Sequence, residues 1–85
     1  MSMERLNENE TFISSDLAIV AALSLHFPIE AIDKRNPYKA YFIFQRTEAL
    51  DRLVKAYYRG EHKEDPIKYF QQLKTIKSRI YSKNE

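Results

Sequence analysis

The sequence predicts a small α+β domain with the element order β-α-β-β-α-α. Three patterns indicate it: a stretch that is apolar on almost every face, a short stretch of alternating apolar and polar residues, and two later stretches with apolar residues at helical spacing. A chain of 85 residues leaves room for one core. We expect a single domain over residues 11–82, in which a short antiparallel sheet packs on helices, with a disordered lead over 1–10 and a tail over 83–85.

The apolar stretch spans residues 16–27 and is predicted to form the central helix of the core. A short strand over residues 11–13 comes before it, separated by residues 14–16, which are Ser, Ser and Asp and therefore suit a helix N-terminus. Pro28 ends the helix, because a proline ring disfavours helical geometry in the residue before it.

A β-hairpin is predicted next, with strands at residues 29–33 and 38–45 and a turn at Asn36 and Pro37. Side chains alternate between the two faces of a strand, so one set in the second strand should face the core. That set comprises Tyr38, Ala40, Phe42 and Phe44.

Two amphipathic helices are expected after the hairpin. The first begins after Thr47 as N-cap and ends at Gly60, the single glycine, in left-handed geometry. Its apolar stripe comprises Leu50, Leu53, Val54 and Tyr57. The second begins with Asp65 as N-cap and Pro66 as its first residue. Its apolar stripe comprises Tyr69, Leu73, Ile76 and Ile80, widened by Phe70 and Tyr81.

No catalytic or metal-binding motif is apparent. One glycine cannot supply a phosphate-binding glycine-rich loop, and there is no cysteine. The spacing of His26 and His62 resembles no zinc ligand set; His26 is expected at a helix end and His62 in solvent. The acidic residues within 61–65 fall in a link between helices, a poor place to hold catalytic carboxylates. We therefore expect a non-enzymatic protein with no cofactor and no metal site.

Basic residues interleaved with aromatic residues are the one pattern that suggests a function. Acidic residues predominate in residues 1–30 and basic residues in residues 66–85, a distribution typical of a polyanion-binding end. Lysine and arginine neutralise phosphates, and tyrosine stacks on bases. The candidate nucleic-acid-binding residues are Lys34, Arg35, Lys39, Tyr41, Lys74, Lys77 and Arg79. The alternative is that these cations only keep the surface solvated and complement the dipole of the last helix.

The order of the stretches FISSDLAIVAALSL, IEAIDKRNPYKAYFIFQRTEALDRLVKAYYRGE and DPIKYFQQLKTIKSRIYS resembles a small domain family of unknown function found in bacteria, archaea and their viruses. The resemblance covers residues 11–82. It rests on these residues: Asp33, Lys34, Arg35, Phe42, Phe44, Tyr69, Phe70, Leu73, Lys74, Ile80 and Tyr81. These are packing motifs, so the resemblance implies a fold and no catalytic residues. Its viral and mobile-element setting favours a protein that handles nucleic acid.

Two alternative functions, which belong to different classes, are therefore expected. The first is a small accessory protein that binds DNA or RNA through a basic and aromatic surface. The alternative is a protein-interaction module, which acts as an adaptor, an inhibitor or a subunit of a larger complex. The first residues lack the pattern of a signal peptide and no stretch could span a membrane, so we expect a soluble, cytoplasmic protein. Self-association stays open as a way to stabilise so short a chain.

Overall fold

The computed structural model describes residues 10–81. The elements are β1 (Thr11–Ser14), α2 (Leu17–Ser24), β2 (Ala31–Asp33), β3 (Tyr41–Gln45), α3 (Glu48–Tyr58) and α4 (Pro66–Tyr81). This order confirms the predicted α+β class and the sequence β-α-β-β-α-α. The predicted disordered lead, apart from Glu10, and the predicted tail at 83–85 lie outside the described residues.

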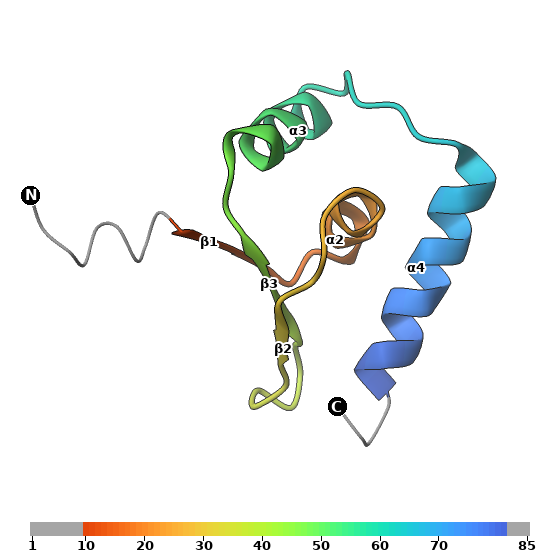
Figure 1. The fold of residues 1–85 in the computed structure, drawn as a ribbon. Helices are drawn as coiled ribbons and strands as arrows, with labels where there is room; N and C mark the ends of the chain where they lie inside the picture. Colours follow the sequence, from red (N-terminus) through yellow and green to blue (C-terminus); the bar gives the residue numbers. More distant parts are fainter. Residues whose placement is uncertain (1–9, 82–85) are drawn as a thin grey trace, which may run out of the picture.

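The three strands form one antiparallel sheet in the order β1-β3-β2 (Figure 1). The central strand β3 places Phe44 opposite Phe12 of β1 and Phe42 opposite Ile32 of β2. Phe42 and Phe44 have no exposed surface and belong to the core cluster, as their alternation predicts.

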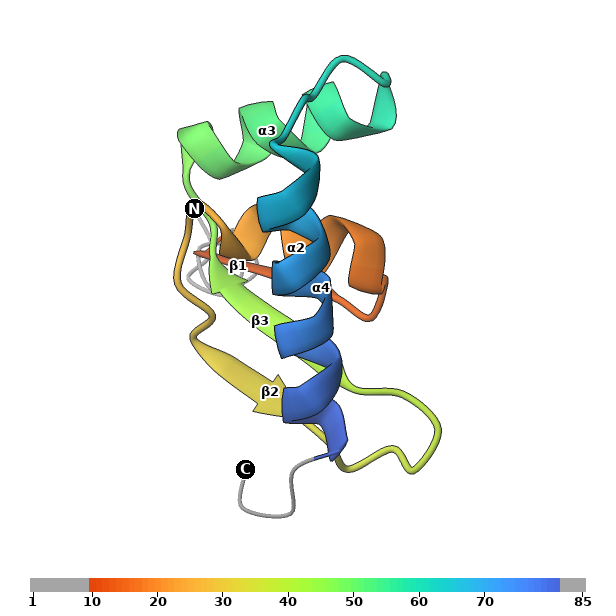
Figure 2. The same ribbon diagram turned by 90° about the vertical axis from the view of Figure 1, so that its right-hand side faces the viewer.

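The helix α2 is the hub of the fold. It lies between the sheet and α4, while α3 lies above it in both views (Figures 1 and 2). Ile19, Val20 and Leu23 are completely buried, which explains why this helix is apolar on nearly every face. The Asp16 carboxylate accepts a hydrogen bond from the Ala18 amide at 3.0 Å and caps the helix as predicted. The helix is shorter than predicted, because the chain already turns over residues 25–27, before Pro28.

Side-chain caps and one glycine set the limits of the later helices, as predicted. Thr47 Oγ1 accepts a hydrogen bond from the Leu50 amide, and Asp65 Oδ1 accepts one from the Ile67 amide. Gly60 follows α3 with φ +73°, in the left-handed region. The four predicted stripe residues of α3 pack in the core, as do Ile76 and Ile80 of α4. Tyr69 and Leu73 of α4 are half-buried.

Three residues predicted to be apolar core are instead exposed. Tyr38 is 91% exposed, because the Asn36 side chain accepts a hydrogen bond from the Tyr38 amide and turns the chain before β3 begins at Tyr41. Phe70 and Tyr81 are 58% and 81% exposed, because α4 meets the short helix α2 along one narrow face. The strand β2 is also shorter than the predicted 29–33. Within residues 10–81, no helix combines the length and apolar character needed to cross a membrane.

Candidate functional site

The hairpin and the last helix meet at the C-terminal end of α4. Between them they carry all the predicted basic residues. Lys34 Nζ donates a hydrogen bond to the backbone carbonyl of Arg79 at 2.6 Å. Carbonyls in the last turn of a helix lack partners within the helix, and a positive charge is favourable there. Lys34 therefore holds the hairpin loop against α4.

A hollow of about 500 Å³ lies at this meeting point. Tyr38 and Lys39 line it from the hairpin loop, Tyr81 lines it from α4, and Lys34 lies in its wall. A smaller hollow of about 210 Å³ shares Tyr38, Lys39 and Tyr81. Among the described residues that line these two hollows, none is acidic. We call the four residues Lys34, Tyr38, Lys39 and Tyr81 the tyrosine hollow.

An exposed row of side chains along α4 leads to this hollow. Phe70, Lys74, Lys77 and Tyr81 recur at i, i+4, i+7 and i+11 and so share one face of the helix. Lys74 Nζ lies 5.0 Å from the centroid of the Phe70 ring, the geometry of a cation–π contact. In these four residues, which we call the α4 stripe, two lysines lie between two aromatic residues.

Arg35 and Tyr41 do not join this surface, and Arg79 borders it only through a separate hollow that it lines together with Lys74. The guanidinium of Arg35 binds both carboxylate oxygens of Asp33, at 3.0 and 2.7 Å. Hydrogen bonds from the Arg35 side chain, and then from its backbone amide, lower the pKa of Asp33 from 3.8 to about 2. The charge of Arg35 is therefore compensated locally.

Tyr41 is half-buried opposite Asp33, on the sheet face that Phe42 does not share. Arg79 is half-buried and lies about 200° around the helix from Lys77. The structure thus brings together Lys34, Lys39, Lys74 and Lys77 from the predicted set. Sequence reasoning missed Tyr38, Phe70 and Tyr81 as surface residues, because their spacing matched the core pattern.

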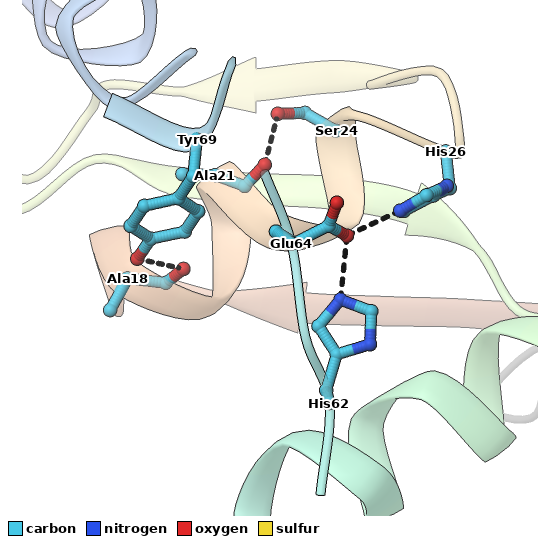
Figure 3. A network of polar contacts seen from close by, with 7 residues as sticks. All are labelled: Ala18, Ala21, Ser24, His26, His62, Glu64 and Tyr69. Carbon is cyan, nitrogen blue, oxygen red and sulfur yellow. Dashed lines mark hydrogen bonds and ion pairs between the residues drawn. The ribbon is translucent and has the colours of Figure 1, made fainter. Parts of the chain in front are cut away.

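A second polar cluster lies at the other end of α4, in the link from α3 (Figure 3). One oxygen of the Glu64 carboxylate, Oε2, contacts Nε2 of both His26 and His62, the latter at 2.6 Å. The His62 side chain is only 17% exposed, so the prediction that it is solvated is wrong. The reason is that the link folds back onto the end of α2, where His26 lies 38 positions before Glu64.

The environment of Glu64 favours its ionised form. Burial raises the pKa of this carboxyl, but hydrogen bonds with His26 and His62 outweigh burial, so the pKa lies below its ordinary value. The two imidazole rings meet edge to face, with centroids 5.9 Å apart. Both histidine Nε2 atoms and a Glu64 oxygen lie within 4.8 Å of one another, and these are donor types found in zinc sites.

A cavity of about 310 Å³ adjoins this cluster and is lined by His62, Glu64, Tyr57 and Tyr69. Tyr69 Oη donates a hydrogen bond to the Ala18 carbonyl at 2.9 Å (Figure 3). Burial, followed by the negative charge of Asp16, raises the pKa of both tyrosines, so both hydroxyls stay protonated at neutral pH.

Fold and surface together describe a small α+β domain with one basic, aromatic end and one histidine-carboxylate end. The chain belongs to the family of the domain of unknown function DUF5659, whose family model matches residues 9–82. This match confirms the resemblance to a family of unknown function. No curated protein and no solved structure matches the chain.

Proposed function

We propose that this protein binds single-stranded nucleic acid at the tyrosine hollow and along the α4 stripe. One observation carries the proposal: Tyr38 and Tyr81, which are 91% and 81% exposed, line the same hollow as Lys34 and Lys39. Exposed tyrosine rings offer faces on which bases stack, and lysines neutralise the phosphates between those bases.

Several features favour a single strand over a duplex. Bases of a duplex are stacked on each other, whereas those of a single strand can lie on an aromatic ring. The α4 stripe adds Phe70, Lys74 and Lys77, and it extends over about 16 Å of helix from Tyr81 in the hollow to Phe70, a path for the nucleic-acid backbone. Stacking and charge carry little sequence information, so binding depends on strand character more than on base order.

The test is a fluorescence anisotropy titration with labelled oligo-dT and oligo-rU at about 50 mM salt. Tyr38→Ala and Tyr81→Ala should each weaken binding by about 1–3 kcal/mol. Tyr58→Ala is the matched control, because Tyr58 is 65% exposed on α3, outside both hollows. Lys39→Ala and Lys77→Ala should each reduce the slope of log affinity against log salt by about 0.7.

Two results would refute the proposal. One is no binding by the parent protein up to about 100 µM, the weak end of non-specific affinities. The other is an equal loss of affinity in Tyr58→Ala, which would show that the tyrosine hollow is not the binding surface. Circular dichroism of each variant separates a loss of binding from a loss of fold.

A protein-interaction module remains the second candidate, because Ile67 and Phe70 are apolar residues 68% and 58% exposed on α4. An apolar protein interface should persist at salt concentrations that abolish phosphate contacts. A pull-down from extract with and without nuclease separates the two functions. A protein retained after nuclease treatment, and lost in Ile67→Ala, would favour the second one.

Nucleic-acid binding suits a cytoplasmic accessory protein of viral or mobile-element origin. The absence of cysteine fits a reducing compartment.

A further inference from the structure

We propose that His26, His62 and Glu64 bind a divalent transition-metal ion, with zinc as the leading candidate. The chain has two histidines, and both direct Nε2 at the same carboxylate oxygen (Figure 3). They come from two separate segments of the chain, His26 from the turn after α2 and His62 from the link before α4. This site lies at the opposite end of α4 from the tyrosine hollow and does not depend on the proposed function.

The positions of the three donor atoms suit a mononuclear site. They lie within 4.8 Å of one another. Zinc bonds of about 2.0–2.2 Å in a tetrahedron place neighbouring ligand atoms about 3.4 Å apart. Small side-chain rotations would therefore bring the donors onto one ion. The ion would replace the two hydrogen bonds to Glu64 with three metal–ligand bonds.

The donor types define the class of ion. Imidazole nitrogen suits zinc and its neighbours in the first transition row, whereas magnesium and calcium prefer a full set of oxygen ligands. Two histidines and one glutamate are three protein ligands, so a fourth tetrahedral position is left for water or another ligand. The His26 side chain is 45% exposed, and His62 and Glu64 line a cavity. Both provide room for that position.

A bound ion would also connect two parts of the chain. At present Glu64 joins the end of α2 to the α3–α4 link through hydrogen bonds. Metal–ligand bonds at the same atoms would strengthen this connection and stabilise the folded state, because the unfolded chain holds its two histidines far apart. Metal binding should therefore raise the thermal midpoint Tm.

The experiment uses the full chain freed of metal with a chelator and titrated with zinc chloride by calorimetry, followed by thermal unfolding. We expect one zinc per chain, and a rise in Tm of roughly 10–20 °C when zinc is about 100 times the Kd. Magnesium should not raise Tm. Cobalt should give the visible absorption bands of a tetrahedral ion.

Glu64→Gln is the decisive variant. Its amide can still hydrogen-bond to both histidines, so the fold is retained, but an amide is a poor zinc ligand. Loss of a group that only hydrogen-bonds to a metal ligand lowers metal affinity roughly 10–100-fold. Loss of Glu64 as a ligand should lower zinc affinity by more than that. His62→Gln should do the same. Glu61→Gln is the matched control for lost charge, because Glu61 is exposed in the same link and is outside the ligand set.

Three outcomes would overturn the proposal. The first is an absence of any heat of binding and of any change in Tm with zinc at 100 µM, which would make the cluster a hydrogen-bonded tether only. Binding could be equal in the parent and in Glu64→Gln, which would place the ion elsewhere. Equal losses in Glu61→Gln and Glu64→Gln would show that general surface charge attracts the ion.

Discussion

The two ends of α4 differ in how they use polar side chains. At the N-terminal end, the half-buried Glu64 contacts two histidines and Tyr69 donates to the Ala18 carbonyl, so the polar atoms bind one another. At the C-terminal end, Lys34 donates to the Arg79 carbonyl, while Tyr38 and Tyr81 remain almost fully exposed.

One helix can therefore carry two chemically different groups of side chains at its two ends when another element, here α2, holds it in place. The helix α4 packs on α2, with Ile76 in the core cluster and Ile80 partly buried against it, so neither polar end has to supply that packing. The N-terminal end of α4 can then adjoin a cluster of histidine and carboxylate side chains, and the C-terminal end can expose tyrosine rings and lysines.

Leu23→Ala should destabilise the protein most, because Leu23 is fully buried in the hub on which both ends depend. Removing a buried leucine side chain costs about 2–5 kcal/mol, a large part of the stability of a small domain. Urea unfolding measures the loss. A midpoint close to that of the parent would mean that α2 is not the hub.

Lys34→Met should cost about 1–2 kcal/mol, because a charged hydrogen bond to the Arg79 carbonyl is lost while the apolar stem is kept. Lys39→Met is the control at the same end. Its side chain is exposed, and its removal should leave the free energy of unfolding unchanged. If both variants unfold alike, Lys34 does not hold the hairpin loop to α4.

Tyr69→Phe and Tyr81→Phe remove the same hydroxyl from the two ends of α4. The first should cost about 0.5–1.5 kcal/mol, because it removes the hydrogen bond from Tyr69 to the Ala18 carbonyl. The second should cost nothing measurable, since the Tyr81 side chain is 81% exposed. Guanidinium unfolding of both variants gives the comparison directly. An equal loss of unfolding free energy in the two variants would contradict the difference between the hydrogen-bonded N-terminal end and the exposed C-terminal end of α4.

The pair of Asp33 and Arg35 should give the smallest effect. The pKa of Asp33 is lowered from 3.8 to about 2, so its stabilising contribution is complete above pH 4 and is lost as pH falls from 4 to 2. Carboxyl carbon NMR should show Asp33 titrating near pH 2 in the parent and near its ordinary value in Arg35→Gln. An ordinary Asp33 pKa in the parent would mean that Arg35 is available to phosphates.

Local chemistry made most of the fold predictable. The caps Asp16, Thr47 and Asp65 act within three residues of their partners, and Gly60 needs only its own φ. Strand alternation correctly placed Phe42 and Phe44 in the core, because one face of β3 packs against α2.

The surface could not be predicted in the same way. Periodicity gives the spacing of apolar residues but not the width of the surface that covers them, so Tyr81 was assigned to the core. Tyr38 was misplaced because the Asn36 turn shortens the strand. The histidine cluster was missed because His26 lies 38 positions before Glu64, and no local spacing rule connects residues so far apart in the sequence.

The central claim is that nucleic acid binds at the C-terminal end of α4 and leaves the N-terminal end untouched. The most direct measurement is a two-dimensional amide NMR titration of labelled protein with unlabelled oligo-dT. The account predicts shifts at Tyr38, Lys39, Lys77 and Tyr81, with His62 and Glu64 unmoved. Shifts centred on His62 and Glu64, or no shifts at any oligonucleotide concentration, would contradict it.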